Sequence, residues 1–419
     1  MRERKQAAKR GAAPAAAGAA ETVALVGMDA HSEKIVLCVT RWRHGSDPET
    51  VKEIVTTLDA LEATYARQVP PGALTVLEAS TNAFSIHGRL AAVGQEAKVL
   101  ASDTLAGRAR ADRVNDRIDA RNLALAYARG GAREVHVPSP LHAQWRDLFF
   151  GHRNAVKDCT RCSNRLWSFC GGHGLKLPKK SFRRKIESVR QDVLARGWTE
   201  DEMFHVERLL GEYAHALKTR AAYRRRIEGV VAGNADMIRL TQIPGVRFIT
   251  AFALVAFIED VKRFENPRKL AGYIGLNPSV ASSGKKEGPR GLSRYGRSDL
   301  KALLVEAAQS AMRKSNGDAA SRWARRKAAS GKHRNVAACA LARKLAVRAW
   351  HILMGHPAPD RECERPFRLK LAKLAAAAGR ERLAALGFRK PADFIADVCA
   401  RVYPPPAPPE PRAAAPASA

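Results

Sequence analysis

The sequence predicts an N-terminal α/β domain, then a basic helical region, then a second, mostly helical domain. Apolar runs typical of strands lie within residues 22–101. Helical spacing with many basic residues fills residues 142 to about 228, and the pattern changes again at Leu240. A chain of 419 residues is long enough for such a multidomain arrangement, with a separate core in each domain.

The N-terminal domain is expected to alternate strands with helices. Its first two strands are joined by a tight connection through His31 and Ser32. The expected strands are residues 22–28, 34–41, 49–57, 73–77 and 97–101, and the expected helices are residues 58–68, residues 82–93 and a last helix that carries Asp116. The order is strand, strand, strand, helix, strand, helix, strand, helix. This is the order of a ribonuclease-H-like domain.

Four acidic residues mark this domain. Asp29 ends the first apolar run and Glu78 ends the fourth. Asp116 and Asp119 are three residues apart, so on a helix their carboxylates project from the same face. Like charges this close repel unless a cation or water separates them. A solvated helix start is the alternative for the aspartate pair, but with Asp29 and Glu78 the four carboxylates predict a divalent metal site.

The composition indicates a polyanionic partner. Lysine and arginine number 72 against 41 acids, which gives a formal net charge of +31. A charge of this size favours nucleic acid over a membrane surface, and no apolar run reaches the roughly 18 residues of a transmembrane helix. The seven cysteines are scattered and odd in number, so we expect a reducing cytoplasm and no disulfide framework.

Two short cysteine- or glycine-containing patterns allow more than one interpretation. Cys159 and Cys162, with Cys170 and His173 nearby, have the spacing of a zinc half-site, although no second such pair follows and the segment has helical spacing. Residues 240–251, with Pro244-Gly245 at their centre, resemble half of a phosphate-binding helix-hairpin-helix. A core helix-turn-helix element explains this second segment equally well.

Basic residues are the expected nucleic-acid contacts. Those of the helical arm are Lys179, Lys180, Arg183, Arg184, Arg224, Arg225 and Arg226. A solvated helix face is the alternative for such charge runs. A glycine- and serine-rich segment, residues 272–297, adds Lys285, Lys286, Arg290, Arg294 and Arg297. We expect a flexible loop here, whose hydroxyls among phosphate-binding cations suit phosphodiester chemistry; a loop that only touches the DNA backbone is the alternative.

The predicted domain boundaries follow these changes in pattern. We expect a disordered basic tail (1–20), the α/β catalytic domain (21–140), a helical basic linker or coiled-coil arm (141–235), a C-terminal domain (236–356), a helical extension (357–403) and a disordered Pro/Ala-rich tail (404–419). The long helix of the arm is expected at about residues 200–230, and further helices at 298–312, 336–354 and 365–386.

Several motifs together resemble one known family. They are Gly27-Met28-Asp29, Leu77-Glu78-Ala79-Ser80, Asp116-Arg117-Ile118-Asp119-Ala120, Ile243-Pro244-Gly245, residues 271–278 (AGYIGLNP), the Ser282-Ser283-Gly284-Lys285 stretch and Gly296-Arg297. In this order they resemble the DEDD-type insertion-sequence transposases, which are bridge-RNA-guided DNA recombinases. The resemblance runs from about residue 22 to 355. The N-terminal tail and the extension beyond about Pro357 depart from the family pattern.

The resemblance implies the chemistry of both domains. It implies a RuvC-like N-terminal domain in which two Mg²⁺ ions are held by Asp29, Glu78, Asp116 and Asp119. It also implies a C-terminal transposase domain whose catalytic serine attacks the scissile phosphate and leaves a covalent phosphoserine–DNA intermediate. The family register favours Ser282, while the adjacent Ser283 is chemically equivalent.

The resemblance also implies the partners. These are donor and target DNA, a structured guide RNA encoded by the element, and further copies of the chain, as homodimers that pair into tetramers in the cytoplasm, associated with the nucleoid. Two alternatives stay open. One is a RuvC-like, structure-specific DNA nuclease that uses water; the other is a non-catalytic DNA-binding architectural protein, which leaves the strand-end acids Asp29 and Glu78 unexplained.

Overall fold

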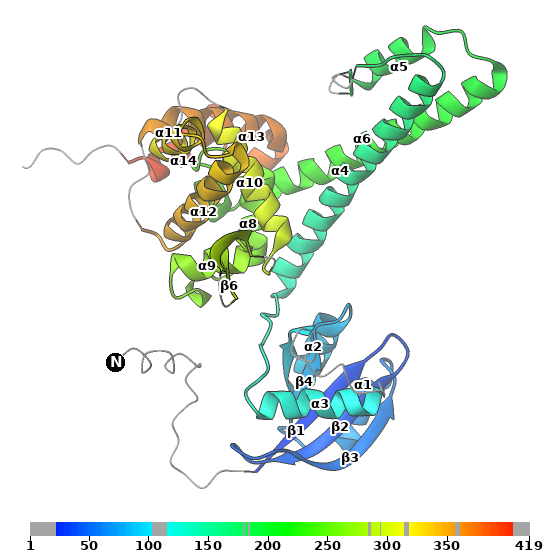
Figure 1. Cartoon of the computed structure of the whole chain (residues 1–419), viewed down its shortest axis with the longest axis vertical. Coiled ribbons are helices and arrows are strands. Elements are labelled where there is room, and N and C mark those ends of the chain that lie inside the picture. Colours follow the sequence, from blue (N-terminus) through cyan, green and yellow to red (C-terminus); the bar gives the residue numbers. More distant parts are fainter. Residues whose placement is uncertain are drawn as a thin grey trace, which may run out of the picture. The chain divides into compact units, whose positions relative to one another are not determined.

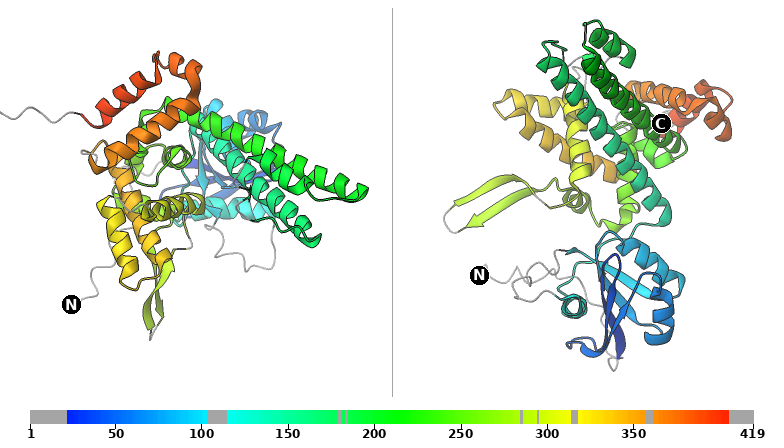
Figure 2. Two further views of the ribbon diagram at one scale, coloured as in Figure 1. Left: turned by 90° about the horizontal axis from the view of Figure 1, so that it is seen from above. Right: turned by 90° about the vertical axis from the view of Figure 1, so that its right-hand side faces the viewer.

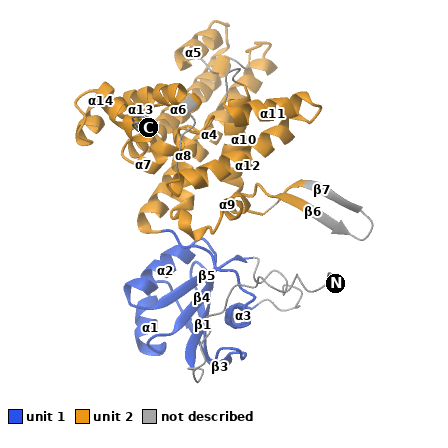
Figure 3. Cartoon of the chain, turned by 90° about the vertical axis from the view of Figure 1, so that its left-hand side faces the viewer, with its two compact units in different colours: residues 1–138 blue, residues 139–419 orange. Residues whose placement is uncertain are grey.

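The chain separates into two compact units, Met1–Pro138 and Ser139–Ala419 (Figure 3). The computed structural model describes residues 22–102, 115–178, 181–182, 185–283, 286–293, 295–313, 318–356 and 361–404. Unit 1 is a mixed α/β domain and unit 2 is mostly helical, which confirms the predicted fold class at this level. The further division of residues 139–419 into arm, C-terminal domain and extension stays a prediction.

Unit 1 is built around one five-stranded sheet. Its elements are β1 (Val23–Ala30), β2 (Ile35–Trp42), β3 (Glu49–Thr56), α1 (Leu61–Gln68), β4 (Leu74–Glu78), α2 (Ala83–Ala92), β5 (Glu96–Leu100) and α3 (Asp116–Ala128). The strand order across the sheet is β3-β2-β1-β4-β5. Strands β1, β2 and β3 pair antiparallel, whereas β1, β4 and β5 pair parallel. Elements follow one another along the chain in the predicted order.

Helices cover both faces of this sheet (Figure 1). Side chains of a strand alternate between its two faces, so Val26 and Met28 join the core formed with α1 and α2. Leu25 belongs to the opposite core, where Leu123 and Ala124 of α3 cover the sheet. Helix α3 is therefore the main helix that covers this face of the sheet.

Unit 2 begins with a pair of long helices. Helices α4 (Pro140–Gly172) and α6 (Glu200–Ala232) lie side by side and antiparallel, and α5 (Ile186–Leu194) packs near one end of the pair (Figures 1 and 2). An ion pair joins Arg165 to Glu212 at 3.4 Å. The N-terminus of α6 is fixed by a capping box between Thr199 and Glu202, which satisfies two backbone amides at once. The predicted long helix is confirmed.

The core of unit 2 surrounds a helix in which Thr250 is the one polar residue. Helix α8 (Phe248–Ile258) is buried at all positions but one. Around it are α7 (Ala235–Leu240), η3 (Val261–Arg263), α9 (Pro267–Ile274), α10 (Ser298–Met312), α11 (Ala319–Ala329) and α12 (Arg334–Leu353). Gly245 precedes α8 with a φ of 79°, and a Cβ there would lie 1.9 Å from the Ala307 carbonyl oxygen. The turn at Gly245 is thus packed directly against α10.

The expected flexible loop between α9 and α10 is largely a β-hairpin, so that prediction was wrong for most of the segment. Strand β6 (Pro278–Ser283) pairs antiparallel with β7 (Lys286–Leu292). Ser283 is paired with Lys286, which leaves two residues between the strands. A two-residue connection that begins with glycine, here Gly284, is a known hairpin signal. The segment was predicted as a loop because it is rich in glycine and serine.

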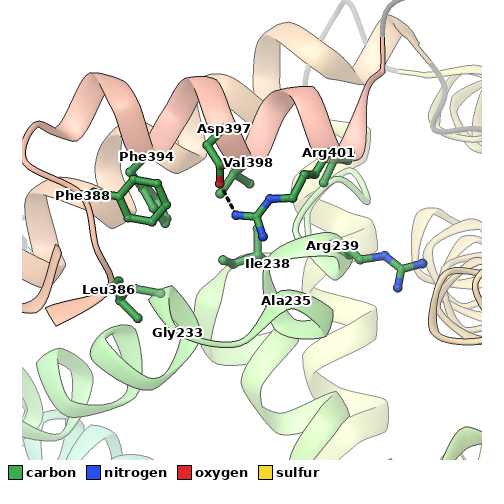
Figure 4. A pocket seen from close by; sticks show the side chains of 12 residues that line it. Gly233, Ala235, Ile238, Arg239, Leu386, Phe388, Phe394, Asp397, Val398 and Arg401 are labelled. Carbon is green, nitrogen blue, oxygen red and sulfur yellow. Dashed lines mark hydrogen bonds and ion pairs between the residues drawn. The ribbon is translucent and has the colours of Figure 1, made fainter. Parts of the chain in front are cut away.

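The C-terminal region is helical, as expected. It contains η4 (Arg361–Cys363), α13 (Glu364–Ala385) and α14 (Pro391–Val402). Helix α14 and the turn before it enclose a cavity of about 510 Å³ against the end of α6 and the start of α7 (Figure 4). Phe388 and Phe394 line it, and the Asp397–Arg401 ion pair lies beside them. None of the helices in the described parts of the chain is long and apolar enough to cross a membrane.

Candidate active site

Two of the four predicted acids lie at the ends of neighbouring parallel strands. In the register of β1 and β4, Met28 is paired with Leu77, so Asp29 and Glu78 each follow directly on the paired residues. Asp29 has the same strand parity as Leu25, and Glu78 the same parity as Val76, and both apolar residues face α3. Both carboxylates therefore project toward the sheet face that α3 covers.

Helix α3 brings the other two acids to the same place. Asp116 and Asp119 lie in its first turn. Asn115 is the N-cap, and its side-chain oxygen accepts a hydrogen bond of 3.1 Å from the Arg117 amide. The positive end of the helix dipole favours carboxylates in this turn. The predicted helix start is confirmed, and it fixes where the two side chains leave the helix.

A glycine allows α3 to approach β1 closely. A Cβ at Gly27 would lie 1.8 Å from the carbonyl oxygen of Ala120 and 3.1 Å from the amide nitrogen of Ala124. Real Cβ atoms do not come this near to backbone atoms, so only glycine fits here. Because Gly27 is two residues before Asp29, the close contact holds the first turn of α3 against the strand end that carries the acid.

The four carboxylates influence one another electrostatically. Burial is the main reason that the pKa of Asp29 is raised, and the charges of Asp116 and Asp119 raise it further, whereas His31 acts in the opposite sense. Burial also raises the pKa of Glu78, with added contributions from Asp29 and Asp119. The charge effects among these acids require short distances. The structure thus brings all four predicted acids together.

Two basic residues, His31 and Lys34, also lie at the cluster, and no role was predicted for them from the sequence. His31 Nε2 lies 3.3 Å from Asp29 Oδ2 and 3.8 Å from Asp116 Oδ1. Lys34 Nζ donates a hydrogen bond of 2.8 Å to Asp116 Oδ2, which is the main reason that the pKa of Asp116 is lowered. Both residues belong to the β1–β2 connection. Their position directly after the acid-bearing strand was the available signal.

The donor atoms fit a divalent cation. Carboxylate oxygens are the preferred ligands of Mg²⁺. Asp29, His31 and Asp116 each offer one ligand atom, and these atoms lie within 4.8 Å of one another. Among the described residues no other set of three histidine, cysteine or acidic side chains meets this criterion. Cys159, Cys162, Cys170 and His173, considered above as a zinc half-site, do not bring three such ligand atoms together in the described structure.

The predicted nucleophile lies in unit 2. The backbone of Ser282 is part of β6 and is paired with Glu287 of β7. Lys286 and Arg290 belong to β7, whereas Lys285 and Arg294 lie outside the described residues. Arg297 is already engaged: it pairs with Asp299 at 2.7 Å and lies 4.1 Å from the centre of the Phe257 ring.

The predicted nucleic-acid contacts of the arm are only partly described. Lys179, Lys180, Arg183 and Arg184 lie outside the described residues. Arg224 forms an ion pair of 2.8 Å with the buried Glu228. Arg225 and Arg226 are exposed on α6, and no acid partner is found for either one within the described parts of the chain.

Part of this chain matches a known protein family. Residues 237–324, which run from α7 into α11, match the transposase family described as IS116/IS110/IS902. This chain is similar to insertion-sequence transposases. The transposase for insertion sequence element IS1111A of Coxiella burnetii is 29% identical over 243 residues, which are 57% of this chain and 66% of the relative.

Two further relatives extend the similarity over different lengths. The probable family 20 transposase of Pseudomonas aeruginosa is 28% identical over 302 residues, or 69% of this chain and 86% of the relative. The putative transposase y4qE of Sinorhizobium fredii is 28% identical over 239 residues, or 55% of this chain and 56% of the relative. For the first and last of these three relatives, the match thus spans less than two thirds of their length.

Proposed function

We propose that this chain is the transposase of an insertion sequence, which cuts and rejoins DNA strands at a metal-dependent four-carboxylate site. The observation that carries the proposal is the convergence of Asp29, Glu78, Asp116 and Asp119 in a chain whose residues 237–324 match a transposase family. Neither feature alone is sufficient. A carboxylate cluster also occurs in hydrolases, and family similarity does not identify the reacting groups.

We infer a ribonuclease-H/RuvC-like fold for unit 1. The strand order β3-β2-β1-β4-β5, with an antiparallel first half and a parallel second half, supports this inference. So does the placement of acids at the ends of the first and fourth strands and at the start of the late helix.

The four carboxylates would hold Mg²⁺, in keeping with the predicted pair of ions. Bound there, the metal would neutralise charge on the phosphate and activate an attacking oxygen. Lys34 already lies among these acids, so its charge offsets part of their repulsion when no metal is bound, and His31 lies beside Asp29. In addition, Lys34 fixes the orientation of the Asp116 carboxylate by donating to it.

Ser282 is the proposed nucleophile, by resemblance to the family. Its oxygen would form a bond to the scissile phosphorus while the bond to the departing strand breaks, giving a phosphoserine and a free hydroxyl end. An unaided serine is a weak nucleophile and needs a neighbouring activator. Ser283 is the alternative at this position, and water is the alternative for a nuclease.

A test of the nucleophile uses the covalent intermediate. We expect Ser282→Ala to abolish both recombination and the protein-linked DNA seen on a denaturing gel after incubation with labelled DNA. Ser283→Ala is the matched control and is expected to keep both. An adduct that persists in Ser282→Ala would assign the role to Ser283, and an active wild type without any adduct would instead support the water-using nuclease.

The proposed partners are DNA and a structured RNA encoded by the element, held by assemblies of several copies of the chain. The net charge of +31 supports binding of more than one polyanion. We expect the logarithm of affinity to fall with the logarithm of salt concentration, with a slope of about −0.7 to −0.9 per neutralised phosphate. Filter binding across a salt series would measure this slope, and a flat response would contradict the proposal.

A further inference from the structure

A second cavity in unit 2 has more charged residues in its lining than the cavity beside α14. It has a volume of about 650 Å³ and lies among α4, α6, the start of α8 and α10. Five arginines line it: Arg153, Arg220, Arg224, Arg247 and Arg313. Helices distant in the sequence thus bring several guanidinium groups to one hollow in the surface.

Most of these arginines lack an acid partner. Arg224 pairs with Glu228, but Arg153, Arg220, Arg247 and Arg313 have no ion pair with any residue that the structure describes. The cavity contains two further acids. Asp299 is paired with Arg297, which lies outside the lining, and Glu306 is exposed. An excess of positive charge therefore remains without compensation.

The excess positive charge affects the pKa of a histidine in the cavity wall. His152 lies on the cavity wall, and its pKa is lowered by burial and, in addition, by the charges of Arg220 and Arg224. The first turn of α8 also lines the cavity, and the N-cap residue Arg247 provides no side-chain hydrogen bond to it. The free amides and the helix dipole there favour an anion.

The size and walls of the cavity limit what it can hold. A volume of this order is typical of small-ligand pockets, so a double helix is too large to enter. Phe149, Val156 and Leu303 give part of the lining an apolar character. Phosphates along a single strand match the arginines, while the sugars and unpaired bases match the apolar part.

We propose that this cavity binds the phosphate backbone of an unpaired segment of nucleic acid. Arg153 and Arg220, from the two antiparallel helices, contact the phosphates, and Arg247 and Arg313 extend the contact across the start of α8 and the end of α10. The proposal refines the nucleic-acid binding expected of a transposase, but it does not depend on strand transfer or on the carboxylate site.

The test compares the full-length wild type with the double variant Arg153→Gln/Arg220→Gln. Fluorescence anisotropy would follow binding of short labelled single strands, one of DNA and one of RNA, and of a DNA duplex, across a salt series without Mg²⁺. Loss of two phosphate contacts is expected to weaken binding of single strands roughly tenfold at low salt and to reduce the salt slope by about 1.4. Duplex binding is expected to change by less than about twofold.

The control is Lys157→Gln/Lys218→Gln. These two lysines are exposed on the same two helices, carry the same total charge and do not line the cavity. The control is expected to bind single strands like the wild type. A loss restricted to the DNA strand or to the RNA strand would identify which partner occupies the cavity. Equal affinities in all three proteins, or an equal loss for duplex, would overturn the proposal.

A second readout follows the wild-type protein rather than a charge variant of the cavity. Bound phosphates would offset the charges of Arg220 and Arg224, so the pKa of His152 should rise on addition of the single strand. NMR titration of histidine-labelled protein, with His152→Asn to assign the signal, measures this shift. An unchanged His152 signal at saturating strand would exclude the cavity as the binding site. Loss of strand transfer with these binding results intact would refute only the transposase proposal.

Discussion

Replacing Asp119 by asparagine is expected to reduce strand cleavage by about a thousandfold or more, with nucleic-acid binding retained. Asparagine has nearly the same shape, so α3 can keep its start at Asn115. The variant loses one of four carboxylate charges that would hold the metal, and metal catalysis contributes several kcal/mol to such reactions. The measurement is single-turnover cleavage of labelled DNA in Mg²⁺, in the presence of the proposed guide RNA.

A control variant and a measurement of metal binding test whether the effect is specific to the carboxylate cluster. The control variant is Asp201→Asn. Asp201 is an exposed acid that is also in the first turn of a helix, α6, but it is far from the cluster in sequence. This variant should cleave DNA like the wild type. Binding of Mn²⁺, followed by electron paramagnetic resonance, should weaken in Asp119→Asn and not in Asp201→Asn. Near-normal recombination by Asp119→Asn in Mg²⁺ would show that the four-carboxylate assignment is wrong.

Replacing Gly27 by alanine is expected to disrupt the site without touching any acid. The new Cβ would meet the backbone of α3 at Ala120, at 1.8 Å, and a backbone atom cannot rotate away as a side chain can. Helix α3 must shift or detach, at a cost of about 3 kcal/mol or more. Hydrogen–deuterium exchange should therefore become faster in α3, and the cleavage activity should be lost together with the helix position.

Gly88 provides the matched control for this experiment. It lies in α2 of the same unit, is exposed, and a Cβ there meets nothing within 4 Å. Alanine at an exposed helical position is expected to be neutral or to stabilise by about 0.5–1 kcal/mol. Unchanged exchange in α3 of the Gly27→Ala variant would mean that the contact between α3 and β1 is not needed to hold the acids.

The positions of the four acids in the fold could be predicted because each one follows from a strong local signal, while their role as metal ligands stays a prediction. Asp29 and Glu78 end apolar strand runs, and Asp116 and Asp119 follow an N-capping asparagine. Period-two alternation then places the strand acids on one sheet face. His31 and Lys34 were missed because basic residues in a turn are usually solvated, and only the fold brings this turn to Asp116 of α3, although its place directly after the acid-bearing strand was a signal.

Unit 2 was harder to predict from its sequence. The segment around Ser282 has the composition of a loop, but the pairing of Ser283 with Lys286 makes it a hairpin. Composition alone does not reveal whether two neighbouring segments pair as strands. The arginine-lined cavity could not be foreseen either, because Arg153, Arg220 and Arg313 belong to three helices that only the folded chain brings together.

The antiparallel pair of α4 and α6 also sets the distance between the core of unit 2 and the end of the pair that packs with α5. Phe149 of α4 belongs to the core of unit 2, whereas Cys170 of the same helix packs with α5. At the helical rise of 1.5 Å per residue, these two positions are about 32 Å apart. A duplex lying along the pair would cover about nine base pairs over that length. The length of the two helices therefore fixes this distance. Inserting or deleting helical turns in both of them would change the spacing between any contacts made at the two ends of the pair.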